Sequence, residues 1–234
     1  MVDLSGAAVA TFERVSLVET AYERLREDII FGRLAPAEKL RIDDLRSRYG
    51  LGSTPLREAL SRLTATGLVE ATSQRGFRVT PISEDDLEDV ARLRVRLETD
   101  ALRESIEHGD ERWEEAVAGA HHLLNRIERR GLRRDDASFA AWEERNRAFH
   151  ESIVSACRSR WTLRFRLQIY DQHERYRRIS HVSAPARARD VTQEHAAIRD
   201  AALSRDADTA CRLTERHIMR TIDAIRTIVK HPPR

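Results

Sequence analysis

Three histidines and one asparagine lie on the apolar stripes of different predicted helices: Asn146, His150, His195 and His217. Asn146 and His150 are four residues apart and therefore point from one face of the same helix. Helices that bundle along their apolar stripes would turn these four side chains toward one interior point. Buried imidazoles that converge there repel one another when protonated, and a bound divalent metal ion removes that repulsion.

These four residues are therefore candidate ligands of a divalent metal ion such as Zn, Ni, Mn or Fe, with Zn expected first in purified protein. Each histidine taken singly also fits a structural role, and spacing along the chain does not by itself establish that the side chains meet. The remaining six histidines are interpreted as structural: His108, His121, His122, His173, His181 and His231.

A second group of residues has the types that contact nucleic acid. Between Arg46 and Arg78 the chain has six arginines and only two acids, although the net charge of the whole chain is only +2. Cations that neutralise phosphates supply much of the energy of DNA binding. Arg57 would lie one turn into a helix that starts at Thr54, on the side away from its apolar residues. There a bidentate contact to guanine is worth about 1–3 kcal/mol of discrimination.

Ser53 and Thr54, with the free N–H groups at this helix start, suit a phosphate group, and Pro55 takes the first helical position, where its missing N–H costs nothing. Arg75, at the tip of a predicted hairpin, can enter the minor groove, and Gly76 permits close approach of the backbone. Arg57 and Arg75 also fit the simpler interpretation of solvated surface arginines.

The elements that position these residues follow from the spacing of apolar side chains. Residues 17–31 and 42–49 predict two amphipathic helices, and Thr54 is the expected N-cap of a third. Apolar and polar residues then alternate over 69–79 around a turn that contains Gly76, which predicts a β-hairpin. This order is typical of a winged helix-turn-helix, here residues 15–81, behind a loosely attached tail at 1–14.

Residues 82–230 have helical periodicity and no convincing strand pattern. Six helices are expected, at about 84–108, 111–130, 136–157, 160–179, 188–204 and 207–230. The predicted fold class is therefore mainly α, with an N-terminal winged helix-turn-helix that includes a small β-hairpin and a C-terminal all-α helical bundle.

The composition narrows the class of protein. With 41% hydrophobic and 34% charged residues in 234, the chain is typical of globular domains with solvated helices. It has no run of 18 apolar residues and no basic segment followed by an apolar one at its start, so we expect a cytoplasmic protein with no membrane span. Cys157 and Cys211 form no metal-binding pair and are expected to be buried thiols.

The stretch from Tyr22 to Val79 resembles the DNA-binding domain of the GntR superfamily. The resemblance rests on Tyr22–Arg26, Gly32–Pro36, Thr54–Leu60 (TPLREAL), Gly67–Val69 and Arg75–Val79. It implies that Arg57 and the wing tip at Gly76 contact operator DNA. Members commonly have Ser-Arg before Thr-Pro, whereas this chain has Gly52 and Ser53 there. Its operator is therefore expected to differ from the usual one.

Residues from about Asp86 to Ile225 resemble the FCD ligand-binding domain of the FadR subfamily, in its six-helix form. The matching runs are Arg94–Glu98, Asn146–His150, Glu194–His195 and His217. The resemblance implies a metal held by Asn146, His150, His195 and His217, and Arg94 as a cavity residue that can hold a carboxylate of the effector. Asn146 offers a neutral carbonyl where Asp would offer a charge, so we expect weaker metal binding than at an Asp site.

Together these features predict a DNA-binding transcription regulator, and more specifically a repressor, whose affinity for operator DNA responds to a small organic acid at the metal site. A homodimer on a palindromic operator is expected. Two alternatives remain: a metal-free sensor of an acyl ligand, and a metal-dependent hydrolase with Glu151 or Glu194 as general base. The hydrolase is disfavoured because a helix turns each glutamate about 100° away from the adjacent histidine. The sequence does not name the effector, the metal species or the operator.

Overall fold

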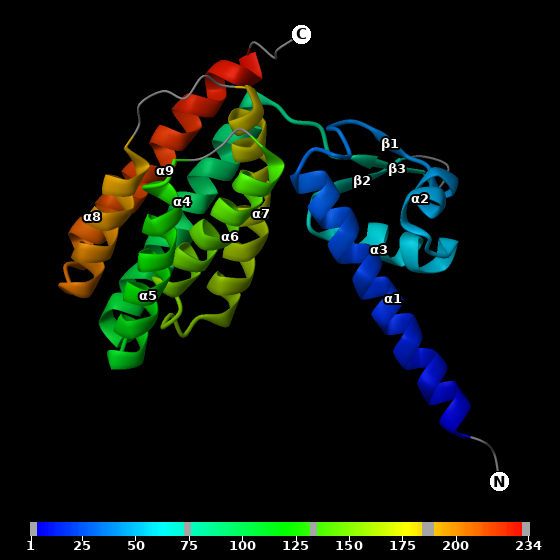
Figure 1. Ribbon diagram of the computed structural model, residues 1–234, viewed down its shortest axis with the longest axis horizontal. Coiled ribbons are helices and arrows are strands. Elements are labelled where there is room, and N and C mark those ends of the chain that lie inside the picture. Colours follow the sequence, from blue (N-terminus) through cyan, green and yellow to red (C-terminus); the bar gives the residue numbers. More distant parts are fainter. Residues whose placement is uncertain (1–3, 73–75, 132–134, 184–189, 231–234) are drawn as a thin grey trace. The chain divides into compact units, whose positions relative to one another are not determined.

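The computed structural model describes residues 4–72, 76–131, 135–183 and 190–230. Within these ranges only the backbone is described at 4–15, 136, 179–183 and 227–230. The chain divides into two compact units, Met1–Ser83 and Glu84–Arg234. Figure 1 shows that the first unit contains helices and a small sheet, whereas the second is helical.

In its described residues the first unit has three helices and a three-stranded antiparallel sheet. The elements are α1 (Leu4–Ile30), β1 (Lys39–Leu40), α2 (Ile42–Tyr49), α3 (Ser53–Ala65), β2 (Val69–Thr72) and β3 (Gly76–Val79). Strand β3 lies between β1 and β2, with Leu40 opposite Phe77 and Val69 opposite Val79. The predicted winged helix-turn-helix is confirmed, with β2 and β3 as the wing.

The core of this unit lies where α1 packs against α3. Four-residue spacing places Ala21, Leu25 and Ile29 of α1 in that core, where all three are buried. Leu17, the first residue of the helix predicted over 17–31, lies four residues before Ala21 but is 45% exposed, and Val18 is buried instead. The apolar face of α1 therefore begins one residue later than predicted.

Helix α1 itself begins at Leu4, so residues 4–14 are helical where the sequence analysis expected a loosely attached tail. Amphipathic spacing does not detect this part of the helix. Its several alanines have the highest helix propensity of all residues, which supports a helix without any apolar stripe.

Helix α3 begins at Ser53, one residue earlier than predicted. Gly52 occupies the N-cap position and no side chain caps the helix, so the assignment of Thr54 as N-cap was wrong. Pro55 is the third residue of the helix rather than the first. Its missing N–H still costs nothing, because the first N–H groups of a helix have no partner within it. Gly50, in the left-handed region with φ 67°, makes the turn between α2 and α3.

Strand β1 was not predicted, because two residues are too short to show alternation of apolar and polar side chains. Next to it, the N–H of Val79 donates to the carbonyl of Glu38 at 2.9 Å, and the N–H of Ala37 donates to the carbonyl of Val79 at 3.1 Å. These bonds attach the segment before α2 to the wing.

The described residues of the second unit form six helices and no strand: α4 (Glu84–His108), α5 (Glu111–Glu128), α6 (Asp136–Ser152), α7 (Arg160–Ser183), α8 (Val191–Leu203) and α9 (Ala207–Lys230). Helix α4 packs against α7 and α9, α5 packs against α6 and α8, and α8 packs against α9. The predicted helical bundle is confirmed.

Helix α6 ends at Ser152, earlier than the predicted residue 157. Tight turns follow, in which N–H groups bond to carbonyls three residues back, as Val154 does to Glu151. Ile153 and Val154 remain buried in these turns, so the apolar pattern continues although the helix has ended.

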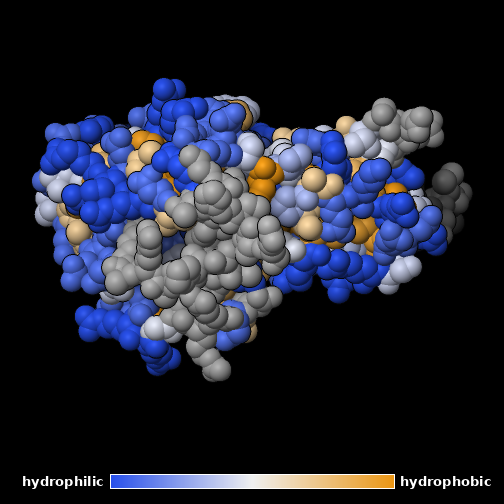
Figure 2. Space-filling model, turned by 90° about the horizontal axis from the view of Figure 1, so that it is seen from above, coloured by the Kyte–Doolittle hydropathy of each residue, from blue (hydrophilic) through white to orange (hydrophobic). Residues whose placement is uncertain are grey.

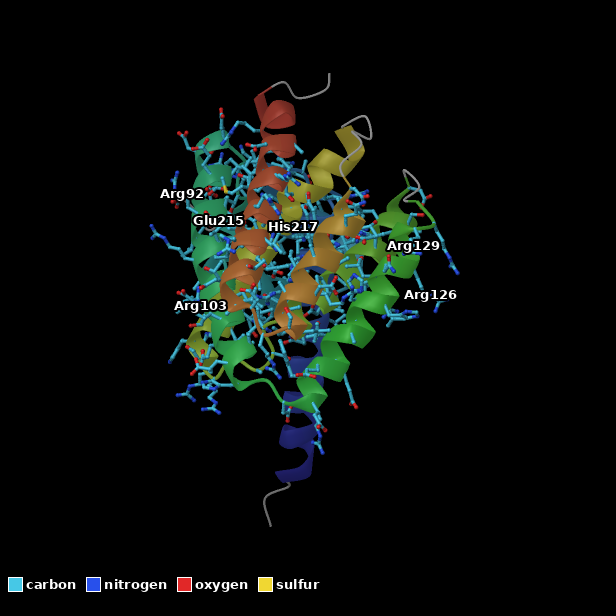
Figure 3. All side chains as sticks on the ribbon, turned by 90° about the vertical axis from the view of Figure 1, so that its left-hand side faces the viewer. Arg92, Arg103, Arg126, Arg129, Glu215 and His217 are labelled. Carbon is cyan, nitrogen blue, oxygen red and sulfur yellow. The ribbon has the colours of Figure 1, made fainter. Side chains whose placement is uncertain are left out.

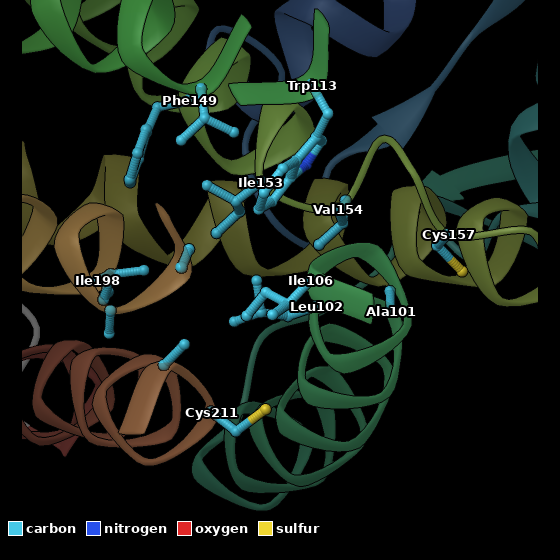
Figure 4. Packing of buried hydrophobic residues seen from close by; sticks show 14 of the residues in the cluster. Ala101, Leu102, Ile106, Trp113, Phe149, Ile153, Val154, Cys157, Ile198 and Cys211 are labelled. Atoms are coloured by element: carbon cyan, nitrogen blue, oxygen red, sulfur yellow. The ribbon is translucent and has the colours of Figure 1, made fainter. Parts of the chain in front are cut away.

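The bundle core surrounds Phe149, which is fully buried (Figure 4). Ile153 and Trp113 lie near it from one side of the bundle, and Ile198 and Leu102 belong to the same cluster. Because His150 follows Phe149 directly, this packing also fixes the backbone that carries the first of the candidate metal ligands.

No helix in the described part of the chain is long and apolar enough to cross a membrane. The face drawn in Figure 2 is largely hydrophilic, in agreement with the high content of charged residues.

Candidate functional site

His150 from α6, His195 from α8 and His217 from α9 meet inside the second unit. Each offers one ring nitrogen such that the three atoms lie within 4.8 Å of one another. The ring centres are 5.4 Å apart for His150 and His195, 5.3 Å for His150 and His217, and 4.7 Å for His195 and His217. Three predicted ligands therefore converge, as the bundling of apolar stripes required. Nitrogens at this spacing can bind one ion of the size of Zn²⁺.

Two carboxylates set the tautomers of this histidine triad (His150, His195 and His217). Nδ1 of His195 donates to Oε1 of Glu128 at 2.9 Å, and Nδ1 of His217 donates to Oε2 of Glu194 at 2.8 Å. A carboxylate only accepts, so in each ring the proton is on Nδ1 and the lone pair is on Nε2. Nε2 of His195 is buried and has no hydrogen-bond partner in the described residues. Such an arrangement fits a metal ligand.

His150 differs from the other two because neither of its ring nitrogens has a hydrogen-bond partner in the described part of the chain. Burial lowers its pKa well below the usual value, and the neighbouring His217 and His195 lower it further. Arg94 and Arg166 act in the same direction. His150 is therefore a neutral imidazole near pH 7, with a lone pair available for an ion.

Asn146 lies one helical turn before His150 and is also buried. Its amide nitrogen donates to the hydroxyl of Tyr170 at 2.9 Å and to Oε1 of Glu143 at 3.4 Å. These two bonds orient the amide group and leave its oxygen as the atom that could join the histidine nitrogens.

Four guanidinium groups surround the ring of the buried Tyr170, with centres 4.6–5.6 Å from it: Arg94, Arg147, Arg166 and Arg177. The ring of Tyr170 is itself 6.3 Å from that of His150. A cluster of four arginines, of which Arg94, Arg166 and Arg177 are buried and Arg147 is half-buried, therefore adjoins the histidine triad. Only Arg94 among them was identified from the sequence.

Arg94 is 2% exposed, and burial lowers its pKa. Its Nε donates to Oε1 of Glu98 at 3.4 Å and its Nη1 to Nδ1 of His173 at 2.6 Å, whereas the buried Nη2 has no partner among the described residues. Arg166 donates to the other oxygen of Glu98 at 2.7 Å. Two buried guanidinium groups thus share one carboxylate, which favours an added anion.

The other histidines do not belong to the triad. His121 and His173 are buried, and their Nδ1 atoms accept hydrogen bonds from arginines, Arg199 for His121 and both Arg94 and Arg177 for His173. The side chains of His181 and His231 lie outside the described residues.

The predicted DNA-contacting residues lie at the start of α3. Ser53, Thr54 and Arg57 are exposed and Pro55 is half-buried, while the opposite face of the helix is buried against α1. Arg57 forms no hydrogen bond or ion pair with any described residue, so its guanidinium is available for a partner outside the chain. Arg75 lies outside the described residues.

Gly76 is the first residue of β3 and pairs with Thr72 across the wing. A Cβ atom at position 76 would lie 2.5 Å from Oγ1 of Thr72. Glycine therefore permits the close approach of the two strands here.

Several arginines that contributed to the predicted basic segment are paired within the first unit. Arg62 contacts Glu19 at 2.8 Å and Arg48 contacts Asp28 at 2.8 Å. Both acids precede the segment that was counted, so the excess of positive charge is smaller than the count over residues 46–78 indicated. Arg57 stands out against these paired arginines.

A winged helix-turn-helix joined to a helical bundle is the architecture of a DNA-binding regulator. Comparison with known proteins gives the family. Residues 17–79 match the gntR family of bacterial regulatory proteins, and residues 89–220 match the FCD domain. The chain belongs to the GntR family of transcription regulators and carries an FCD domain. Because this family consists of regulators, the prediction that the chain is not an enzyme is confirmed.

Similar proteins extend over nearly the whole chain. It is 46% identical to the HTH-type transcriptional regulator BphR of Paraburkholderia xenovorans (strain LB400), over 90% of this chain and 86% of that one. It is 36% identical to the HTH-type transcriptional repressor GlaR of Escherichia coli (strain K12), over 87% and 93%. The solved structure of E. coli McbR/YncC shares the fold, with a TM-score of 0.75 at 18% identity over 90% of this chain and 97% of that one.

Glu128 and Glu194 orient two of the histidines, a role that the sequence analysis did not assign to either. Glu194 was named there only as a general base of the disfavoured hydrolase; a helix turns it about 100° from His195, here toward His217 of α9. Glu128, at the last position of α5, carried no signal of this role in the sequence.

Proposed function

We propose that this chain is a repressor of the FadR subfamily that releases its operator when a small organic acid binds at a metal ion in the helical unit. The observation that carries the proposal is the buried triad, in which carboxylates orient His195 and His217 and the ring nitrogens of His150 have no hydrogen-bond partner among the described residues. GlaR, the relative of 36% identity, is a transcriptional repressor, which supports the direction of regulation proposed here.

In this proposal His150, His195, His217 and the oxygen of Asn146 hold one divalent ion, among Zn, Ni, Mn and Fe, with Zn expected first in purified protein. A carbonyl oxygen contributes less than a carboxylate would, so metal binding is weaker than at a site with Asp. When bound, the ion supplies open coordination positions for oxygens of the acid.

Arg94 receives a carboxylate of the effector. Its buried Nη2 has no hydrogen-bond partner in the part of the chain that the structure describes, and the carboxylate that it shares with Arg166 compensates only one of the two positive charges. An anionic ligand would supply both the missing acceptor and the missing charge. This favours a carboxylic acid over a neutral acyl ligand.

On the DNA side, Arg57 reads a base in the major groove, and Ser53, Thr54 and Pro55 place the start of α3 at the phosphates. Arg75 and Gly76 at the wing would contact the adjacent minor groove. The protein binds a palindromic operator as a homodimer, because two recognition helices related by symmetry read two half-sites. Effector binding that favours one packing of the bundle needs a coupling of about 1–3 kcal/mol to change operator affinity roughly 5- to 150-fold.

Elemental analysis of purified protein tests the metal site. Wild-type protein should contain close to one divalent ion per chain, His195→Ala should lose it, and His122→Ala, at an exposed position on α5, should retain it. Equal metal content in wild type and His195→Ala would overturn the assignment and favour the metal-free acyl sensor. A thermal-shift screen of carboxylic and sugar acids, with and without added metal, then identifies the effector class.

A further inference from the structure

A pocket of about 500 Å³ opens between α8 and α9 directly outside the histidine triad. Its lining includes Asp190, Glu194 and Ala197 from the α8 side, and Leu213, His217 and Arg220 from α9. Figure 3 labels His217 on α9, at the place where α9 runs beside α8. One member of the triad, His217, thus lines this pocket.

His217 is the triad residue that contacts the pocket. It is 7% exposed, whereas His195 is 0% and His150 is 1% exposed. Glu194 lies at the same boundary: Oε2 accepts from His217, and Oε1 accepts from Nη1 of Arg220 at 3.0 Å. The inner end of the pocket is therefore closed by a His217–Glu194–Arg220 chain, whose outer member is on an exposed part of α9.

The charges around the triad differ between its two sides. On the side of α4 and α7, Arg166 donates to the backbone carbonyl of His150 at 2.8 Å, and Arg94 lies 4.7 Å from the ring of Tyr170, which is 6.3 Å from that of His150. A divalent cation that approached from there would be repelled. On the side of α8 and α9 the pocket offers two carboxylates, Asp190 and Glu194. Arg216 and Arg220 also line the pocket, so its cations and carboxylates balance, and Arg220 is paired with Glu194. The pocket therefore lacks the excess positive charge of the α4–α7 side, where Arg94 and Arg166 share one carboxylate.

We propose that the α8–α9 pocket is the access route by which the metal ion reaches the triad, with Glu194 receiving the ion at the inner end of the pocket before His217 does. This inference rests on the proposed metal site. The anionic effector and the metal would then reach the site from opposite sides, the effector from the side of Arg94 and Arg166 and the ion past Glu194.

An access route has a kinetic signature that a ligand residue does not have. A bulky side chain can obstruct the route and leave both the metal-free protein and the metal-bound site unchanged. Such a side chain slows loading and release of the ion by the same factor, so the Kd for the metal stays the same. Ala197 is half-buried in the pocket wall and is not a proposed ligand, so Ala197→Trp and the smaller Ala197→Phe supply the obstruction. The control is Ala207→Trp, in a second pocket lined by Arg103, Ile106, Glu107, Gly109 and Arg205 that contains no residue of the triad.

Co²⁺ is the probe, since its visible absorption reports occupancy of a histidine site during loading of the metal-free full chain and during removal by a chelator. Ala197→Trp should slow both rates by about tenfold, with a smaller effect for Ala197→Phe, while Kd and the control rates stay at wild-type values. Arg220→Ala should accelerate loading, because the approach then loses a cation.

The outcomes separate this inference from the proposed function. If wild-type protein binds Co²⁺ no better than His195→Ala, the metal site itself is wrong. If wild-type protein binds Co²⁺ but Ala197→Trp, with a wild-type circular dichroism spectrum, keeps wild-type rates or changes Kd through only one rate, the access route is wrong. A misfolded Ala197→Trp variant leaves the decision to Ala197→Phe and Arg220→Ala, which must move the rates in opposite directions.

Discussion

Oε1 of Glu128 lies 2.9 Å from Nδ1 of His195, a residue with no exposed surface, and the same oxygen accepts from Nε1 of Trp142 at 3.2 Å. The carboxylate thus holds the imidazole in one tautomer, and Trp142 holds the carboxylate. Glu128→Gln should weaken metal binding by about 10- to 100-fold, because Gln can no longer stabilise the imidazole as a charged acceptor does. Competition with a chelator of known affinity measures the change.

Glu115, on the same helix but exposed, supplies the matched substitution. Glu115→Gln should leave the metal affinity at the wild-type value. If both variants bind metal equally well, the hydrogen bond to His195 has no part in metal binding, and Glu128 is only a structural partner of the imidazole.

Arg57 is exposed on α3 and has no partner within the described part of the first unit, whereas Arg62 on the same helix is paired with Glu19 and lies 4.3 Å from the ring of Tyr22. Arg57→Ala should therefore weaken the free energy of operator binding by about 1–3 kcal/mol or more and remove discrimination at one base pair. The folding stability of the variant should be that of wild type. Arg62→Ala should reduce stability instead. Gel retardation and thermal unfolding of both variants decide the matter. Full retention of operator specificity in Arg57→Ala would contradict the placement of α3 in the major groove.

The sequence predicted the helices of the bundle and the three histidines of the site because both depend on local periodicity. His150, His195 and His217 each follow an apolar stripe, and helices that bury such stripes must bring the polar residues on them inside. Convergence itself was implied by family resemblance. In the structure one ring nitrogen of each histidine lies within 4.8 Å of those of the other two.

Features that depend on contacts between distant segments could not be predicted in this way. Glu128 ends α5 and reaches a histidine 67 residues later, and Arg166 reaches the carbonyl of His150 from α7. Neither has a local pattern. The start of α3 was misplaced for a different reason: Thr54 is a better N-cap residue than Gly52, but the turn that Gly50 makes fixes where the helix begins.

Asp28 joins α1 to α2 through a hydrogen bond from the hydroxyl of Tyr49 at 2.6 Å and ion pairs with Arg33 and Arg48. Burial alone would raise its pKa, but these three partners outweigh burial and lower it below the usual 3.8. The carboxylate then stabilises the folded state fully above about pH 3.8, and this stabilisation is lost as pH falls through the lowered value.

Asp28→Asn should accordingly reduce the free energy of unfolding by about 1.5–3 kcal/mol at neutral pH, with the difference from wild type shrinking below about pH 3.8. Urea unfolding of both proteins from pH 7 to pH 3 measures this difference. Glu38→Gln, in the same unit and exposed, controls for general charge effects. A difference that stays constant down to pH 3 would mean that the charge of Asp28 is not what stabilises the unit.

Arg94→Gln tests the effector half of the proposal, because the buried Nη2 of Arg94 lacks a partner within the described segments. Arg92, on the same helix, is exposed and pairs with Glu88 and Asp89, so it supplies the control. Arg94→Gln should keep its metal but lose the stabilisation that an active organic acid confers, whereas Arg92→Gln should keep both. If the acid stabilises Arg94→Gln as strongly as wild type, the carboxylate is held elsewhere. In Arg94→Gln the carboxylate of Glu98 is paired with Arg166 alone, so the two charges cancel. The Arg166–Glu98 pair then has no uncompensated positive charge left to attract an anion.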